Sequence, residues 1–597
     1  MNETKVTNPV NIKSRTRVAP KRMQQTAQKR KGIQFDNAAQ RKTYVGYVYE
    51  AGTNIIKSKI LDEIDDRFSI PHREGDFHIH DLEAYGQTYN CLQVDILQGF
   101  PYKRFEEYST SRKIIEIINH YKDVIAKLGN EQSGGIGFPN FDDEMCVLFN
   151  RMDITVNDEN LDLLRCSIES FVDWSNRARE RCGQTTYYVT LNLGLSTTIV
   201  GRFTTKSVIE YYMNSPAEII KPNIVFKVKK GINHLPNDPN YDLFCLANES
   251  TCKKMIPTYL LFDSKVNSEF DPRMVGIMGC RTKVVSSLFG EDRSIGRINV
   301  DCATLNLPRI ALKISRSSND LPICQKIMLF KQLCKKQSDV LCDLLIDRYH
   351  RLITMDKGDF PVNCKYNIQL TDFNNASSLE EIFRHGTLSI GFIGLSEAFE
   401  ILSGEKFYHS KENHLLALDI VGYMRNLLDE YRQTHQLNFT LLASAGEYIS
   451  GRFPDIDRLE FDHPILEEEY YTNSFHVDVN SGLNPLEKVR IEGPFHELSN
   501  GGCITYVEFQ SAPLNNIEAI AEVLEESVRS GINYIGFNFP LDSCRTCKEV
   551  GTFDDCPKCG GSDIFRIRRV SGYLEELEYF TPGKKAEEFH RTPNART

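Results

Sequence analysis

Four cysteines near the end of the chain have the spacing of a metal site. Cys544, Cys547, Cys556 and Cys559 form two C-x-x-C pairs separated by eight residues. Two such pairs can direct four thiolates at one zinc ion, and the metal can replace the hydrophobic core that so small a module lacks. A redox role for one C-x-x-C pair is the alternative. Because the two pairs occur together, we favour structural zinc.

A glycine follows this cysteine module, in the stretch RRVSGYLEE at residues 568–576. Glycine inside ordered structure costs stability, so Gly572 marks a turn, a bulge or a close approach between two backbone segments. Its place directly after a metal-binding pattern also allows a chemical role.

Three further residues lie upstream in apolar surroundings: Cys91 in TYNCLQVDIL, Cys280 in MVGIMGCRTKVV and Asn306 in TLNLPRIAL. A cysteine in an apolar strand is most often a small core residue, and an asparagine before Leu-Pro often shapes a turn. His78 and His80 share one strand face without a neighbouring ligand cluster, which argues against a metal site there.

The elements that could position these residues alternate along the chain. Residues 46–130 are mainly helical by their apolar spacing. Beyond them, strand-like runs such as TYYVTLNLGLS and GTLSIGFIGLS alternate with long helices, which predicts an α/β fold with a buried sheet. A change in composition near residue 540 separates a large α/β domain (46–535) from a C-terminal cysteine module (536–597).

Composition restricts the class of protein. Hydrophobic residues make up 41% and charged residues 25% of the chain, as in ordinary globular proteins. No apolar run reaches the roughly 18 residues that span a bilayer, and the N-terminus lacks a secretory apolar segment. We therefore expect a cytoplasmic protein without a membrane partner. Its 17 irregularly spaced cysteines indicate reduced thiols and metal ligands more than a disulfide framework.

Residues 1–45 are strongly basic, whereas the whole chain carries a net charge of −10. We expect a flexible N-terminal arm there, because the segment has no apolar periodicity. A nucleic-acid-binding protein with a zinc ribbon is a rival interpretation. It is disfavoured because the acidic remainder of the chain opposes a large phosphate-binding face.

Together these segments resemble the anaerobic (class III) ribonucleoside-triphosphate reductases, a family of glycyl radical enzymes. The cysteine module followed by R-x-x-G-Y-L is similar to the family's zinc site and radical loop. The three segments quoted above, with YTNSFHV (471–477) and NGGCITYVEF (500–509), match further family segments in family order from about residue 70 onward. Formate-lyase and dehydratase types of glycyl radical enzyme are the nearest alternative, but they lack the cysteine module before the radical loop.

The resemblance implies a ten-stranded α/β barrel with a central finger loop, joined to a small C-terminal zinc and glycyl radical module. It makes Gly572 the stored radical and Cys280 the thiyl cysteine at the loop tip. Cys91 becomes the reducing cysteine, and Asn306 a polar residue at the reacting ribose. Intact Gly572, Cys280 and Cys91 argue against a catalytically silent homologue.

Further residues follow from the same resemblance. Small residues and backbone N–H groups can approach a triphosphate closely, which suggests the substrate-binding set Asn473, Ser474, Gly501 and Gly502. Glu447, in ASAGEYISGRF, is an additional polar candidate.

The family also implies partners. A radical-SAM activating enzyme with an iron–sulfur cluster would install the radical, the substrates would be ribonucleoside triphosphates, and the chain would form a homodimer. ATP or deoxynucleotide effectors are a family property. However, residues 1–45 are too short for the family's ATP-cone module, and SRKIIEIINHYKDVIAKLG matches its effector segment poorly.

Family members take electrons either from formate or, through a cysteine pair, from a redoxin. Asn306 beside a single obvious reducing cysteine, Cys91, resembles the formate-dependent group, so we predict formate as co-substrate. Cys302 lies four residues before Asn306 on the same strand face and could in principle approach Cys91. A small core residue is the simpler interpretation of Cys302.

Overall fold

The computed structural model describes residues 43–594 except residues 319 and 515. No helix in this part of the chain is long and apolar enough to cross a bilayer. Residues 1–42 of the predicted basic arm lie outside the described residues. The first described helix, α2 (Tyr44–Glu63), begins just inside the predicted end of that arm.

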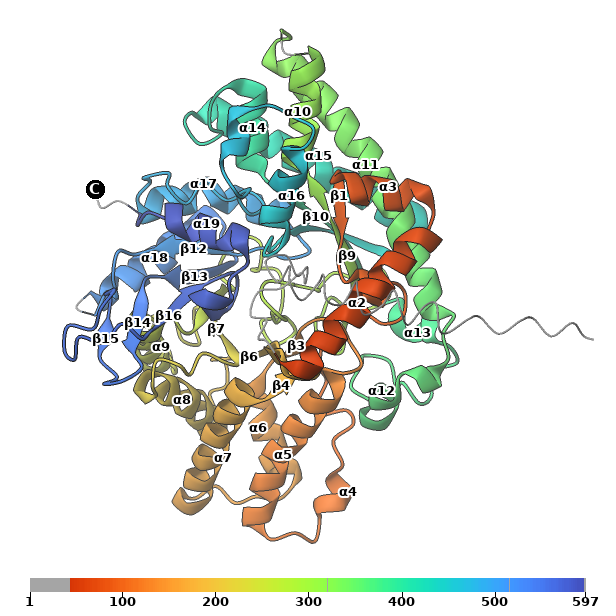
Figure 1. The fold of residues 1–597 in the computed structure, drawn as a ribbon. Coiled ribbons are helices and arrows are strands. Elements are labelled where there is room, and N and C mark those ends of the chain that lie inside the picture. Colours follow the sequence, from red (N-terminus) through yellow and green to blue (C-terminus); the bar gives the residue numbers. More distant parts are fainter. Residues whose placement is uncertain (1–42, 319, 515, 595–597) are drawn as a thin grey trace, which may run out of the picture.

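Five parallel strands form the first half of a barrel: β2 (Cys91–Gln93), β3 (Ile136–Phe138), β6 (Val189–Leu193), β7 (Asn223–Val228) and β8 (Thr258–Leu261). Parallel neighbours need crossover connections, and helices supply them. These are chiefly α5 (Thr110–Leu128), α6 (Phe141–Arg151), α7 (Asp158–Arg177), α8 (Ile199–Asn214) and α9 (Tyr241–Lys254). Figure 1 shows these helices outside the central strands.

Five more strands form the second half: β9 (Ile298–Asn306), β10 (Thr387–Ile393), β11 (Asn438–Ala443), β12 (Thr505–Glu508) and β13 (Tyr534–Asn538). The first three pair in parallel, as do the last two. Their long covering helices are α10 (Leu307–Ser318), α11 (Ile323–Ile353), α14 (Leu395–Ser403), α15 (Lys411–His435), α17 (Pro485–Leu498) and α18 (Ile517–Ser530).

The two halves run antiparallel to each other, because the junctions β2–β9 and β8–β13 are both antiparallel. A loop before β12 closes the ring. Gly501 donates its N–H to Leu441 O over 2.8 Å, and Ala443 donates to Gly502 O over 3.0 Å. An eleventh strand, β1 (Phe77–Ile79), pairs with β9 outside this path. The predicted ten-stranded α/β barrel is confirmed.

A long loop, residues 262–297, connects β8 to β9 and forms the predicted finger loop. Polar residues that alternate with apolar ones in β6 hold it inside the barrel. The Asn192 amide donates to Ile277 O over 2.9 Å and accepts from Ile277 N over 2.8 Å. Thr190 Oγ1 donates to Gly279 O over 2.8 Å, one residue before Cys280. The sequence alternation in TLNLGLS thus fixes the tip of the loop.

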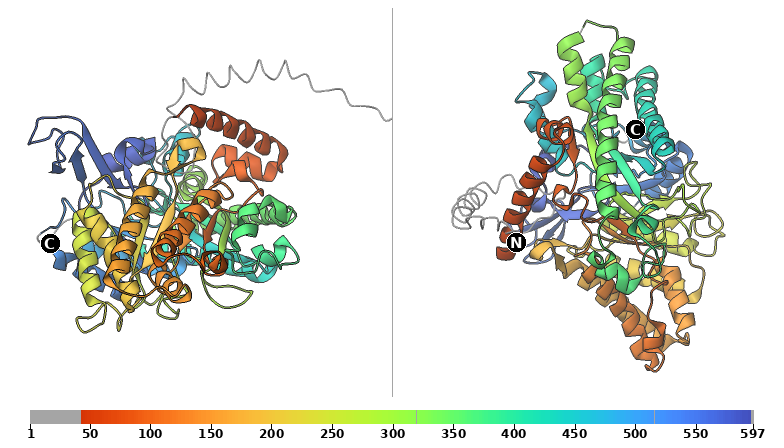
Figure 2. Two further views of the ribbon diagram at one scale, coloured as in Figure 1. Left: turned by 90° about the horizontal axis from the view of Figure 1, so that it is seen from below. Right: turned by 90° about the vertical axis from the view of Figure 1, so that its right-hand side faces the viewer.

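A small antiparallel sheet follows the barrel: β14 (Leu541–Cys544), β15 (Val550–Gly551), β16 (Ile564–Arg569) and β17 (Leu574–Glu576), with helix α19 (Pro582–His590) after it. Figure 2 shows this C-terminal module at one side of the barrel. The last barrel strand extends to Asn538, so the barrel ends a few residues after the predicted boundary at 535.

Candidate active site

A cavity of about 120 Å³ lies at the tip of the finger loop. The finger loop, the strand ends of the first half-barrel, the loop after β11 and the turn after β16 all contribute to its walls. The lining side chains with acid–base, thiol or hydroxyl groups include His80, Asp81, Cys91, Tyr188, Cys280, Arg281, Cys302, Ser444, Glu447, Tyr448 and Tyr573. Cys91 and Cys280, far apart in the sequence, therefore line the same cavity.

Cys280 is fixed by the residues on either side of it. The Arg281 guanidinium is buried and donates to Ala443 O and Ser444 O, each over 3.1 Å. Burial raises the pKa of the Cys280 thiol; Arg281 partly offsets this effect and the Glu447 carboxylate reinforces it. Cys280 therefore keeps its S–H hydrogen at neutral pH, which a hydrogen-atom donor requires.

Gly572 lies directly against Cys280. It occupies the tight turn between β16 and β17, where Val570 N donates to Tyr573 O over 3.2 Å. A Cβ at residue 572 would lie 1.6 Å from Cys280 O and 2.7 Å from Cys280 Cα. Its backbone φ is not positive. The close approach to Cys280, and not an unusual φ, is therefore what excludes a side chain.

Glu447 ties this turn to the barrel. Its carboxylate accepts from Ser571 Oγ over 3.0 Å and from Tyr573 Oη over 2.6 Å, one residue on each side of Gly572. Glu447 is only 3% exposed and lies in the loop after β11. Sequence reasoning gave this residue little weight, because nothing local to ASAGEYISGRF predicts a partner more than 120 positions away.

Cys91 is held by backbone and amide groups. Its thiol donates to Asn90 Oδ1 over 2.8 Å and accepts from Gly135 N over 3.0 Å. Asn90 in turn donates to Asp81 Oδ2 over 2.6 Å, and Ser133 Oγ donates to the same oxygen over 2.9 Å. Sequence reasoning missed Asp81, Asn90 and Ser133; the only local signal was that all three are polar residues beside short buried strands.

The four module cysteines lie together, with their sulfur atoms all within 4.8 Å of one another. Cys544 Sγ and Cys559 Sγ are 3.5 Å apart, and Cys547 Sγ and Cys556 Sγ are 3.4 Å apart. A tetrahedral zinc site with Zn–S bonds of about 2.3 Å has sulfur separations of about 3.8 Å, so the set fits zinc. Each C-x-x-C pair is closed by a backbone turn, from Lys548 N to Cys544 O and from Gly560 N to Cys556 O.

Comparison with known proteins assigns the chain to a family. The family model for "Anaerobic ribonucleoside-triphosphate reductase" matches residues 36–593. The chain belongs to the anaerobic ribonucleoside-triphosphate reductase family. The Escherichia coli K12 reductase is 28% identical over 86% of this chain and 76% of its own length. The enterobacteria phage T4 reductase is 27% identical over 87% of this chain and 90% of its own.

Solved structures share the fold. An anaerobic ribonucleotide reductase from Thermotoga maritima with glycerol in the active site has a TM-score of 0.68 at 15% identity, covering 97% of this chain and 94% of that one. Hydroxyproline dehydratase from Clostridioides difficile has a TM-score of 0.56 at 12% identity, covering 90% and 84%. The fold is thus shared by the reductase and the dehydratase, while the family match selects the reductase.

Asn306 does not line the cavity of this reductase. It lies at the far end of β9, fully buried, where its amide donates to Gly75 O and Asp457 Oδ2, each over 3.0 Å. Its Oδ1 accepts from Arg309 N over 3.2 Å. The structure therefore does not bring Asn306 together with the two cysteines.

Cys302 does line the cavity, on the same strand. The register of β9 against β10 shifts near Val300, so residue parity alone does not fix which side chains face inward there. Farther along, Thr304 Oγ1 contacts His80 Nε2 over 2.8 Å and Ser444 Oγ over 2.7 Å. Cys302 thus belongs to the wall that also carries Cys91.

The four residues predicted for the triphosphate do not line this cavity, although Asn473 lies against Gly446 of its wall. Gly501 and Gly502 donate their N–H groups to Leu441 O and Ser499 O, and they join the finger loop to the barrel closure. Asn473 accepts from Lys584 Nζ over 2.9 Å, and Ser474 is fully buried. None of the four lines the cavity with Cys280. Phosphate binding by them stays a prediction.

Proposed function

We propose that the chain reduces ribonucleoside triphosphates to 2′-deoxyribonucleoside triphosphates through a radical stored on Gly572 and passed to Cys280. The observation that carries the proposal is the contact between these two residues beside a cavity at the tip of the finger loop. A radical at a glycine Cα is stabilised by its amide nitrogen and carbonyl, and its C–H bond is close in strength to a thiol S–H bond. Transfer between Gly572 and Cys280 is therefore reversible.

The other residues act in the steps that follow the transfer of the radical to Cys280. The Cys280 thiyl removes the ribose 3′-hydrogen, the 2′-hydroxyl leaves as water, and the 3′-hydrogen returns at the end. Each turnover consumes two electrons and two protons, and Cys91 supplies hydrogen to the substrate radical. The cavity walls exclude water from these radical intermediates. Glu447 holds the Gly572 turn against the finger loop throughout.

Partners complete the proposal. A radical-SAM activating enzyme with an iron–sulfur cluster installs the radical, since the chain contains no C-x3-C-x2-C motif of its own. Zinc at the four module cysteines shapes the sheet that carries Gly572. We also propose a homodimer and control by ATP or deoxynucleotides; one Thermotoga maritima structure carries dATP in its specificity site.

Anaerobic activation tests the proposal directly. The activated wild type should show a glycyl doublet by electron paramagnetic resonance and should convert ribonucleoside triphosphates to deoxynucleotides. Cys280→Ser should keep the doublet, because Gly572 is unchanged, yet form no deoxynucleotide, because an O–H bond is too strong to donate hydrogen to the glycyl radical. Turnover by this variant, or a wild type that never forms the doublet, would contradict the proposed chemistry.

The reductant has two candidates. Formate, oxidised to carbon dioxide, gives two electrons and one proton. The prediction of formate as the co-substrate rested on Asn306. Since Cys302 lines the cavity and Asn306 does not, the geometry favours a second candidate: Cys91 and Cys302 form a disulfide and release two electrons and two protons, and a redoxin reduces them again.

Turnover with labelled formate and with a thioredoxin-type donor separates the two routes. On the cysteine-pair route the donor sustains turnover without formate. Deoxynucleotide formation by Cys302→Ala should then fall by at least about a hundredfold, and each chain should complete no more than one turnover. Cys364→Ala, a similarly half-buried cysteine outside the cavity, should stay active. Labelled carbon dioxide in step with deoxynucleotide, together with a fully active Cys302→Ala, would establish formate instead.

A further inference from the structure

Arg569 is a buried arginine at the end of β16, three residues before Gly572. Its guanidinium donates to three backbone carbonyl oxygens: Phe537 O over 3.0 Å, Gly572 O over 3.2 Å, and Met255 O. These acceptors come from β13, from the turn at residues 570–573 that holds Gly572 (the radical turn), and from the residue after α9. One guanidinium therefore connects the radical turn to both half-barrels.

No carboxylate lies within ion-pair distance of the Arg569 guanidinium in the described residues; the nearby Glu508 carboxylate acts on its pKa only through space. In the described part of the chain its guanidinium makes no ion pair, whereas its neighbour Arg568 pairs with Asp542 over 2.7 Å and with Glu588 over 3.0 Å. Burial lowers the pKa of Arg569, but arginine starts so high that the group stays charged at neutral pH. A buried charge without a counter-ion in direct contact is costly unless dipoles stabilise it, so the three carbonyl contacts are the main direct stabilisation of this guanidinium.

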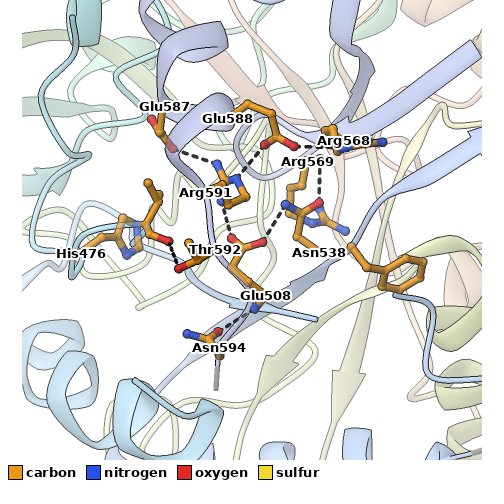
Figure 3. A network of polar contacts seen from close by, with 12 residues as sticks. His476, Glu508, Asn538, Arg568, Arg569, Glu587, Glu588, Arg591, Thr592 and Asn594 are labelled. Carbon is orange, nitrogen blue, oxygen red and sulfur yellow. Dashed lines mark hydrogen bonds and ion pairs between the residues drawn. The ribbon is translucent and has the colours of Figure 1, made fainter. Parts of the chain in front are cut away.

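The surroundings fix where this charge points. Gly536 faces the guanidinium, and a Cβ there would lie 3.3 Å from Arg569 Nε. The backbone N–H of Arg569 donates to Asn538 Oδ1 over 3.0 Å, and Asn538 Nδ2 donates to Glu508 Oε2 over 2.7 Å. Figure 3 shows these contacts continuing from Glu508 to Arg591, which follows α19. The orientation of Arg569 is therefore set by the barrel and the C-terminal segment together.

We propose that Arg569 tunes the radical stored on Gly572 through the carbonyl oxygen of that residue, an inference that rests on the proposed radical role of Gly572. An unpaired electron at Cα delocalises onto the adjacent carbonyl, and a cationic N–H donor at the oxygen strengthens that delocalisation. The contact stabilises the glycyl radical relative to the Cys280 thiyl. Arg569 is thus a positioning residue that keeps the radical on the storage side between turnovers.

Spectroscopy on the activated wild-type protein tests the contact without any substitution. Chains with ¹⁵N-labelled arginine, activated in normal water and in deuterium oxide, should show two couplings of the glycyl radical by pulsed electron–nuclear double resonance: one from an exchangeable proton and one from ¹⁵N. A doublet that lacks both couplings would overturn the proposal. A wild type with no doublet at all would instead contradict the radical role of Gly572.

A matched pair of variants tests the tuning. In Arg569→Lys the three-carbonyl contact is lost, so the splitting of the doublet should increase as spin returns to Cα. The radical should also decay about tenfold faster under anaerobic conditions, the size expected for one charge-assisted hydrogen bond. Arg568→Lys alters the adjacent buried arginine of the same strand and should leave both properties unchanged. Equal splitting and lifetime in the two variants would overturn the proposal, and the wild-type couplings decide the matter if Arg569→Lys does not take up the radical.

Discussion

Replacing Gly572 by alanine is expected to abolish both the glycyl doublet and nucleotide reduction. The new Cβ would lie 1.6 Å from Cys280 O, far inside any permitted contact, and the atom it meets is backbone of the finger loop. The radical turn must therefore move away from Cys280, and a side chain would also twist the Cα centre out of the plane that stabilises a radical. Anaerobic activation followed by electron paramagnetic resonance and product analysis measures both losses.

A control separates this effect from general damage. Gly422→Ala, in α15, introduces a Cβ that meets no other atom within 4 Å, so it should fold, take up the radical and turn over normally. Oxygen should cleave the activated wild type and this control at residue 572, and should leave Gly572→Ala intact. A doublet or deoxynucleotide formation in Gly572→Ala would contradict the assignment.

Loss of the zinc site is the second change with a large expected effect. Replacing Cys547 and Cys556 by serine should remove zinc and, with it, nearly all radical formation, while the barrel stays folded. Structural zinc contributes about 10–16 kcal/mol to the folding of small domains, more than the packing of so small a module can replace. The link to Gly572 is direct, because β14 carries Cys544 and pairs with β16, and β16 leads into the radical turn.

Metal analysis should find one zinc per wild-type chain and none in the double variant. Near-ultraviolet circular dichroism reports whether the barrel remains, and electron paramagnetic resonance reports the radical. Cys324→Ser, at an exposed cysteine in α11, should behave as wild type. Zinc-free protein that still accepts the radical at full yield would refute a structural role for the metal.

Much of the candidate site could be predicted from the sequence, because the proposed chemistry depends on residue types that no others replace. Both Gly572, which follows the cysteine module, and Cys280, in a loop with nearby glycines, stand in short sequence patterns that can be recognised locally. The barrel was predictable for a similar reason: parallel strands buried on both faces give apolar runs between long helices. These signals are local, and the fold preserves them.

The sequence was less informative about residues whose surroundings are set by distant contacts. Asn306 was expected beside the ribose, but the end of β9 places it against Gly75 and Asp457. Cys302 was interpreted as a core residue, yet it lines the cavity, on a strand whose register shifts near Val300. Glu447 received little weight because its partners flank Gly572, far along the chain. No local pattern encodes such long-range pairings.

The closing seam of the barrel has a consequence for mutational scanning. Gly502 has a φ of 129°, and a Cβ there would lie 2.2 Å from Arg281 O. Lys283 N also donates to Gly501 O over 3.1 Å, on the finger-loop side of the same seam. A scan scored by growth or product formation would therefore mark both glycines as intolerant, with a profile indistinguishable from that of nucleotide contacts. Intolerance at this seam reports the register of the finger loop, and only ligand-binding measurements on folded variants can assign a substrate contact there.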